Sequence, residues 1–221
     1  MRQYLQMCFY AAQIKVLMAL SPATLFCKLG QLDWYSGTLQ LWINYHLNEE
    51  GLRVLEVGCA TGYLAEYIFH NGCDVSGVDI SKNMIREALK KNNFIDFRVA
   101  DASKLPFKEE TFDVVLSASV INVTSNPVGV AGQAFRVCKH GGWATFLFPI
   151  DAFTDDDLYR TKTMLGLSGF SAAAMMAWHK SAPKMSVDDV KELLRCAGFS
   201  RCEERLYLNG MVASVSVQKD F

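Results

Sequence analysis

A glycine-containing turn after a short apolar run is the first feature of the sequence that could bind a ligand. The run covers residues 53–57, and the turn over residues 58–62 reads Gly-Cys-Ala-Thr-Gly. Glycine lets a backbone approach a ligand closely and adopt torsion angles closed to other residues. Ligands of open α/β sheets bind beside such turns, at the carboxyl ends of the strands. Because Ala60 stands at its third position, the turn lacks the G-x-G-x-x-G spacing that wraps a dinucleotide pyrophosphate.

Asp79 is the second candidate, at the end of the next apolar run, residues 74–79. It lies 23 residues after Glu56, a position where the carboxylate of an α/β nucleotide site accepts hydrogen bonds from the ribose hydroxyls. Asp is also common at a helix terminus, and Asp79 stands just ahead of Ser81, which could cap a helix. The distance from the glycine turn favours the ribose role.

The elements that would position these residues alternate between strands and helices. Apolar runs predict strands at residues 53–57, 74–79, 95–100, 112–117 and 143–148. Helices are predicted between them at about residues 62–69, 81–91 and 127–138, the last broken by His140-Gly141-Gly142. This order indicates a parallel sheet with right-handed crossovers, hence a doubly wound α/β domain.

The end of the chain departs from this alternation. Ser186 opens a helix in a pattern that resembles a capping box, and Gly198 closes it. Strand-like runs at residues 201–208 and 211–217 flank the dipeptide Asn209-Gly210, a strong hairpin signal. The predicted fold is therefore α/β, with a mostly parallel seven-stranded sheet completed by a C-terminal antiparallel hairpin.

The predicted elements divide the chain into four segments. Residues 1–50 form an N-terminal helical cap, and residues 51–150 a ligand-binding α/β core. Residues 151–185 are a helical insertion that would act as a lid. Residues 186–221 supply the last helix and the hairpin that complete the core.

The composition narrows the classes of partner. The chain has 221 residues, a net charge of −1 and scattered Lys and Arg, so it lacks the concentrated basic face that nucleic-acid binding needs. The seven cysteines are dispersed, with no C-x-x-C pair, which favours a reducing compartment and hence a cytoplasmic protein. The four histidines stand apart from one another and from the cysteines, so no metal site is expected.

Two interpretations apply to the first predicted helix. Residues 4–20 are apolar, but Gln6, Gln13 and Lys15 interrupt them, which falls short of the ~20 uninterrupted apolar residues of a membrane span. We interpret the segment as a helix packed on the domain or over the site. The alternative is peripheral membrane contact by a helix that lies on the membrane surface.

Six motifs, in order and at the right spacing, resemble those of class I, seven-strand Rossmann-like S-adenosylmethionine-dependent methyltransferases. They span the chain from about residue 53 to residue 217, apart from the insertion, at residues 54–62, 77–81, 100–107, 112–117, 133–142 and 187–199. The resemblance is closest to the branch that modifies quinones, sterols and small metabolites, as in ubiquinone and menaquinone biosynthesis.

The resemblance implies S-adenosylmethionine as cofactor and assigns residues to each part of it. Glu56 and the turn would hold the methionine moiety, Asp79 the ribose, and Ile80 with Met84 one adenine face. Asp101 would bond the adenine amino group, with Ala102 close to the ring. The implied cofactor-binding residues are Glu56, Gly58, Cys59, Ala60, Gly62, Asp79, Ile80, Met84, Asp101, Ala102, Ser117 and Ala118, with Ser119 beside the sulfonium.

Two residues depart from the family's pattern. Ala60 replaces the usual middle glycine, and a single methyl group should be tolerated there. His140 replaces a common proline, in a loop expected to lie at the surface and away from the cofactor. Since the sulfonium already carries an activated methyl, a general base is optional. The candidates for a base are Tyr35, His46, Asn122 and His179.

The predicted function is methyl transfer to a small, apolar or aromatic acceptor. The acceptor would lie between Trp34-Tyr35 and apolar residues of the insertion, which are Met164, Met175, Met176 and Trp178. The alternatives are a non-catalytic S-adenosylmethionine-binding partner subunit and a tRNA or protein methyltransferase. A nicotinamide dehydrogenase is disfavoured by the glycine turn and the terminal hairpin. The sequence gives no oligomeric state.

Overall fold

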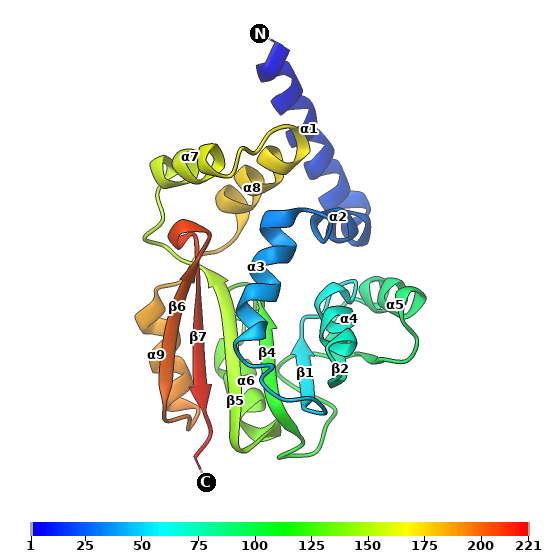
Figure 1. The fold of residues 1–221 in the computed structure, drawn as a ribbon, viewed down its shortest axis with the longest axis vertical. Coiled ribbons are helices and arrows are strands. Elements are labelled where there is room, and N and C mark those ends of the chain that lie inside the picture. The colour runs from blue at the N-terminus through cyan, green and yellow to red at the C-terminus, as the bar shows by residue number, and fades with distance from the viewer. Residues whose placement is uncertain (1, 221) are drawn as a thin grey trace.

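The computed structural model describes residues 2–220, with side chains from residue 6 onward. Within them the chain builds a seven-stranded sheet in the order β3-β2-β1-β4-β5-β7-β6 (Figure 1). The strands are β1 (Arg53–Val57), β2 (Asp74–Asp79), β3 (Asp96–Val99), β4 (Phe112–Ala118), β5 (Cys138–Pro149), β6 (Cys202–Tyr207) and β7 (Val212–Gln218). The first five are parallel, and β7 pairs antiparallel with both β5 and β6. The predicted α/β fold with a terminal hairpin is confirmed.

Both faces of the sheet are covered by helices. These are α4 (Tyr63–His70), α5 (Lys82–Lys91), α6 (Pro127–Val137) and α9 (Val187–Cys196), together with α3 (Asp33–Asn44), whose Leu39, Trp42 and Ile43 pack against the sheet. Neighbouring residues of β1 point to opposite faces: Val54 joins an apolar cluster with α4 and α5, while Leu55 joins one with α6 and α9. A central strand buried on both faces favours apolar side chains, which is why Val54, Leu55 and Val57 of β1 are apolar, with Glu56 as the buried exception.

A helical cap lies over the carboxyl ends of the parallel strands (Figure 1). It is built from α1 (Arg2–Leu20), α2 (Pro22–Leu29), α3 (Asp33–Asn44), α7 (Asp155–Met164) and α8 (Gly169–Ser181). The N-terminal segment and the insertion therefore meet, although more than a hundred residues separate them: Tyr10 packs edge-on against Phe170, and Trp34 Nε1 donates to Ser171 Oγ at 3.1 Å. No helix in the described part of the chain is long and apolar enough to cross a membrane.

The start of β5 differs from the prediction. The segment from Cys138 to Gly142 does not break the chain into a loop but continues into the strand, with a shift of register against β4 between Phe112 and Val114. The chain end supports it, because Gly141 N donates to Lys219 O and Lys219 N donates to Gly142 O. Backbone pairing with the distant chain end therefore holds this segment in a strand, although its two glycines favour a break in regular structure. His140 is half exposed beside Glu110, as expected for a surface residue.

The capping pattern differs too. Ser186 Oγ accepts from the backbone N–H groups of Asp188 and Asp189, so it caps α9 as expected. A reciprocal capping box forms instead at α7, where the side chains of Thr154 and Asp157 each accept from the other's backbone N–H. This box fixes the start of the insertion's first helix.

Candidate functional site

A cavity of about 590 Å³ lies between the carboxyl ends of the strands and the helical cap. Its floor includes Glu56, Asp79 and Ala118, which end β1, β2 and β4 or lie near their ends. Its roof includes Ile14 of α1 and Trp178 of α8. The volume falls in the range of ~300–1,000 Å³ that small-molecule sites occupy.

The glycine turn is held tightly against the neighbouring strand. The backbone N–H groups of Gly58 and Cys59 both donate to Val78 O, at 2.8 and 2.9 Å. Gly58 has φ +81°, and a Cβ there would lie 2.2 Å from Val120 Cγ2. A side chain is therefore excluded at Gly58 on two grounds, and its backbone faces the cavity directly.

Ala60 occupies the left-handed region, with φ +47°. For an L-residue this conformation costs about 1–2 kcal/mol. The family's usual glycine would remove that strain, so the methyl group is accommodated at a cost in stability.

We expect Ala60→Gly to raise the free energy of unfolding by about 1 kcal/mol, measured by urea denaturation. The matched control is Gly62→Ala, since Gly62 has φ +76° and its added Cβ would lie 2.8 Å from Phe97 Cζ. The control should lose stability. A destabilised Ala60→Gly variant would contradict the strain argument.

Asp79 joins the turn to the next helix through both carboxylate oxygens. Oδ2 accepts from Ala60 N at 3.0 Å, and Oδ1 accepts from Ser81 N at 2.8 Å. Burial raises the pKa of Asp79 above its usual value, and these two hydrogen bonds oppose the rise. Each oxygen keeps a second lone pair for a ligand. The helix-terminus role and a cavity-facing carboxylate therefore coexist in one side chain.

Glu56 is the buried acid of the site. It is 5 % exposed, and within the described residues its Oε2 has no hydrogen-bond partner. Burial raises the pKa of Glu56 to about 8, against the effect of the Ala65 N–H in the first turn of α4. An unpaired buried carboxyl oxygen is costly, so this atom is poised to accept from a donor in the cavity. A cationic donor would suit it best, because Asp79 also raises its pKa.

The structure brings most of the predicted cofactor residues to this one cavity. Those that line it are Glu56, Gly58, Cys59, Ala60, Asp79, Ile80, Met84, Asp101, Ala102, Ala118 and Ser119. Gly62 and Ser117 do not. Gly62 lies behind the turn against Phe97, and Ser117 is 1 % exposed within the sheet. Asp101 Oδ1 accepts from both the backbone N–H and the hydroxyl of Ser103 at 2.8 Å, which lowers the pKa of Asp101.

Of the four candidate bases, Tyr35 lines the cavity and the other three make contacts elsewhere. His46 Nε2 pairs with Ser216 Oγ at 3.0 Å in a buried network. Asn122 Nδ2 donates to Pro183 O at 2.8 Å, and His179 Nε2 lies 3.2 Å from Asp155 Oδ1. Burial raises the pKa of Tyr35, and Glu56 adds to the effect, so its phenol stays neutral.

Aromatic side chains form the other half of the cavity. Trp34 and Trp178 stack with ring centroids 6.0 Å apart, and Tyr35 meets Trp34 edge-on at 5.9 Å. The prediction for the methionines of the insertion was wrong. Met175 is fully buried in the core, Met164 is 65 % exposed, and Met176 packs beside the core without lining the cavity.

Sequence reasoning expected the first helix to pack on the domain or over the site, but it named none of the side chains of α1 and α2 that line the cavity. Apolar side chains of α1 and α2 also line the cavity: Ile14, Met18, Leu25, Phe26 and Leu29. The apolar character of residues 4–20 was the available signal, and packing over the site was the expected role. No three His, Cys, Asp or Glu side chains in the described residues come together as metal ligands would.

Comparison with known proteins matches residues 55–146 to the family described as "Methyltransferase domain". Phosphatidylethanolamine N-methyltransferase of Cereibacter sphaeroides is 36% identical over 103 residues, which are 44% of this chain and 50% of that protein. Ubiquinone biosynthesis O-methyltransferase of Burkholderia ambifaria is 30% identical over 110 residues, 48% of this chain and 47% of the relative. The chain thus spans about half the length of the curated relatives it matches.

Solved structures share the fold at lower identity. Phosphoethanolamine N-methyltransferase 2 of Haemonchus contortus, in complex with S-adenosyl-L-methionine, superposes with a TM-score of 0.63 at 17% identity. The match covers 82% of this chain and 52% of that one. At this identity the likeness establishes the fold alone.

Proposed function

We propose that the chain, whose residues 55–146 match the family described as "Methyltransferase domain", is a class I, S-adenosylmethionine-dependent methyltransferase that transfers the methyl group to a small apolar or aromatic acceptor. One observation carries the proposal. A single cavity is lined by a glycine turn and three carboxyl side chains, Glu56, Asp79 and Asp101, on the strand side and by stacked tryptophans in the cap. The two sides suit a charged cofactor and an apolar acceptor.

The donor set fits the cofactor. Glu56 Oε2, buried and unpaired in the described residues, would accept from the α-ammonium group of the methionine moiety. Asp79 would accept from the ribose hydroxyls with its free lone pairs. Ile80, Met84, Asp101 and Ala102 would surround the adenine, and Ala118 with Ser119 would lie beside the sulfonium. Gly62 and Ser117 would act indirectly, by holding the turn and the strand end in place.

Methyl transfer would require the protein to align the acceptor with the methyl group more than to transfer a proton. When bound, the cofactor would supply an activated methyl group: a nucleophile in line with the carbon–sulfur bond would bond to the methyl carbon, and the sulfur would leave as a neutral thioether. The residues of this chain would exclude water and hold the acceptor against the Trp34–Trp178 wall. The neutral Tyr35 phenol would donate a hydrogen bond to orient the nucleophile. The names of the relatives include a phospholipid amine and ubiquinone, so an apolar body is the shared feature of the acceptors we propose.

The second candidate is a non-catalytic S-adenosylmethionine-binding subunit that supports a partner. One observation favours it: three of the four candidate bases are held in contacts outside the cavity. A panel of small-molecule acceptors, with the mass of the product as readout, separates the two. Transfer to any acceptor by the isolated chain excludes the subunit.

The free cysteines support the proposed cytoplasmic setting.

The purified chain should bind S-adenosylmethionine or S-adenosylhomocysteine with a roughly micromolar Kd, about 8 kcal/mol. Isothermal titration calorimetry measures it, with NAD as the control ligand. Binding of NAD, with no heat from either sulfur compound, would contradict the assignment of the cavity.

Binding should also release a proton at pH 7. The pKa of Glu56 is about 8 in the free protein, so its carboxyl is mostly protonated at pH 7. An ammonium partner favours the carboxylate and lowers this pKa. The Glu56 contribution to affinity should therefore fall as the pH drops below 8, by up to about tenfold per pH unit.

The proton release can be counted by calorimetry in buffers of different ionisation enthalpy. Glu56→Gln is the matched variant, because it keeps the shape of the side chain and removes the titration. If the variant releases as many protons as the wild type, Glu56 is not the linked group.

A further inference from the structure

The outer face of α1 is apolar and exposed. Phe9, Ala12, Val16 and Leu20 follow at intervals of three and four residues, which places them on one side of the helix. Phe9 is 64 %, Val16 54 % and Leu20 81 % exposed. The opposite side of α1 packs into the cap, where Ile14 is buried. A helix that is apolar on both sides normally has partners on both sides.

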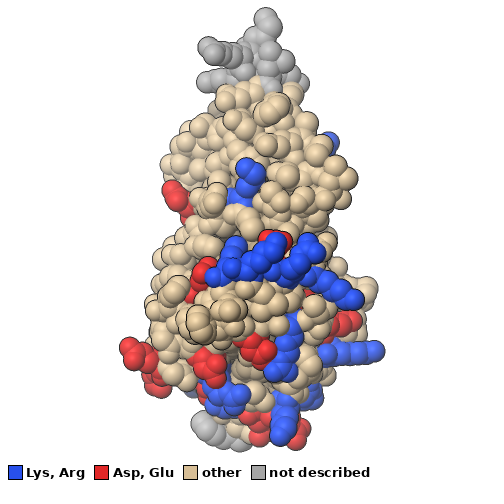
Figure 2. Space-filling view, turned by 90° about the vertical axis from the view of Figure 1, so that its right-hand side faces the viewer, with Lys and Arg blue, Asp and Glu red and all other residues tan. Residues whose placement is uncertain are grey.

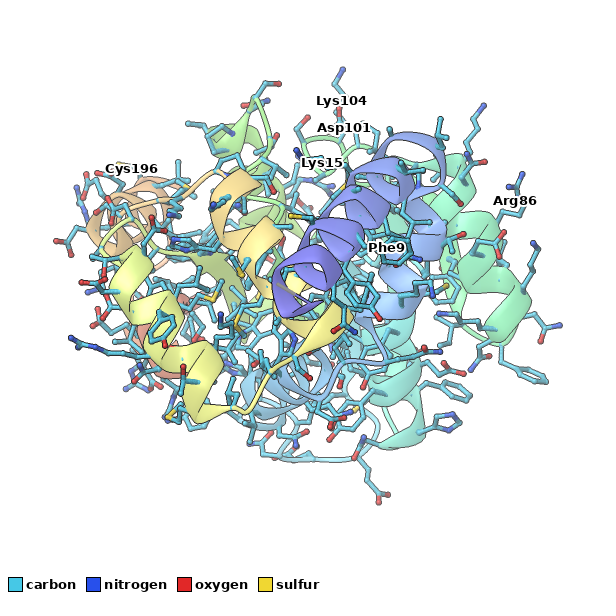
Figure 3. The ribbon with its side chains drawn as sticks, turned by 90° about the horizontal axis from the view of Figure 1, so that it is seen from above. Phe9, Lys15, Arg86, Asp101, Lys104 and Cys196 are labelled. Carbon is cyan, nitrogen blue, oxygen red and sulfur yellow. The ribbon has the colours of Figure 1, made fainter. Side chains whose placement is uncertain are left out.

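This apolar face continues to the mouth of the cavity. Met18 of α1, Ile80 after β2 and Val123 after β4 all line the cavity, and each is more than half exposed. The rim of the opening is therefore apolar on at least two sides. Seen from above, Figure 3 shows Phe9 and Lys15 on α1.

The charges around the apolar face are mostly basic, although Asp101, which lines the cavity, is an exposed acidic residue. Residues 1–32 contain no acidic residue, although the whole chain has a net charge of −1. Lys15 and Lys28 lie on this part of the cap, and α5, which contacts α2, adds Lys82, Arg86, Lys90 and Lys91 against Glu87. Figure 2 shows few charged side chains on the upper part of this side and a band of Lys and Arg below it. Three acidic residues of the insertion, Asp155–Asp157, lie on α7, across the cap from α2 (Figure 1).

We infer that the α1–α2 end of the cap docks on an anionic lipid bilayer, with the cavity mouth facing the membrane. Apolar residues of a surface helix enter the boundary between headgroups and acyl chains, and lysines and arginines around them attract anionic headgroups. An acceptor dissolved in the bilayer would then enter past Met18 and Val123 without crossing water. This last step rests on the proposed function, whereas docking itself does not. A second copy of the chain is the rival occupant, but it would bring two basic faces together.

The test uses the full chain and vesicles that float in a density gradient. Phosphatidylcholine vesicles with about 30 % phosphatidylglycerol should bind it, and pure phosphatidylcholine vesicles should bind it at least about tenfold less. The double variant Val16→Glu, Leu20→Glu should lose at least about tenfold in binding to the anionic vesicles. The matched control is Leu206→Glu on β6, which is 59 % exposed, close to Val16, on another side of the molecule and should bind within about twofold of the wild type.

Three outcomes would overturn the inference. They are no binding of the wild type to anionic vesicles, equal loss in the Leu206→Glu control, and a wild-type dimer in sedimentation that the double variant abolishes. Calorimetry with S-adenosylmethionine keeps the two proposals apart. Normal cofactor binding by the double variant shows that it is folded, while absent cofactor binding by the wild type counts against the proposed function alone.

Discussion

Replacing Asp79 by alanine should weaken the binding of S-adenosylmethionine by about 2–3 kcal/mol, roughly 30- to 150-fold. Its carboxylate lines the cavity, and each oxygen keeps a lone pair for a ribose hydroxyl after accepting from the backbone. The loss has two sources, because the variant also leaves the N–H groups of Ala60 and Ser81 without their acceptor. Calorimetric titration of the folded variant measures the change.

Two further variants separate the ribose role from the helix-terminus role. Ser81→Ala removes the hydroxyl that accepts from Met84 N, so it weakens the cap of α5 but leaves the cavity-facing carboxylate. It should lower stability by about 1 kcal/mol and leave cofactor affinity within about twofold. Asp79→Asn keeps one acceptor oxygen and should fall between the alanine variant and the wild type. Unchanged affinity in folded Asp79→Ala would reduce Asp79 to a helix-terminus residue.

The sequence was sufficient for the elements whose signals are local. Val54 and Leu55 face opposite sides of the sheet, so both had to be apolar, and this apolar pair made β1 recognisable in the sequence. Asn209-Gly210 marked the hairpin because both residues adopt positive φ there. The turn over residues 58–62 was found for the same reason, since Gly58 and Gly62 also have positive φ. In each case one residue type suits one backbone geometry.

Features that depend on distant partners were not predictable in the same way. Gly62 looked like a ligand-binding glycine, but its missing side chain makes room for Phe97, 35 residues later. Gly141 and Gly142 correctly marked the end of α6, but pairing with Lys219 also draws them into β5, whose start the local sequence did not show. His179 looked available as a base, but α7 supplies Asp155 as its partner. In these three cases the neighbouring sequence does not determine which distant residue makes the contact or whether the site is buried.

The aromatic half of the cavity, where we propose that the acceptor binds, depends on such distant contacts most of all. Trp34 and Trp178 come from the N-terminal segment and from the insertion, and they meet because α1 and α3 pack against α8. The sequence placed an acceptor between these segments but could not choose among the side chains of α8. In the structure Trp178 lines the cavity, whereas Met175 is buried in the core.

Trp178→Ala should lower kcat/KM for the methyl acceptor by about 100-fold, near 3 kcal/mol, while cofactor affinity changes by less than about threefold. The substitution removes one of the two stacked rings that would hold an apolar acceptor, and Trp178 is on the opposite wall from Glu56 and Asp79. Radiolabelled methyl transfer to an acceptor from the panel gives the rate, and calorimetry gives the cofactor Kd.

Amide exchange over residues 151–185 should slow when cofactor and acceptor bind together, as a lid hinged at Gly166 and Gly169 requires.

The neighbouring methionines are the controls for the Trp178→Ala prediction. Met176→Ala changes a half-buried side chain of the same helix that does not line the cavity, so transfer should stay within about twofold. Met175→Ala should instead cost about 2–5 kcal/mol of stability, because it leaves a void in the core. A general loss of rate in all three variants would mean that α8 acts by supporting the fold. Loss confined to Trp178→Ala, with the cofactor still bound, would place the acceptor against the tryptophan wall.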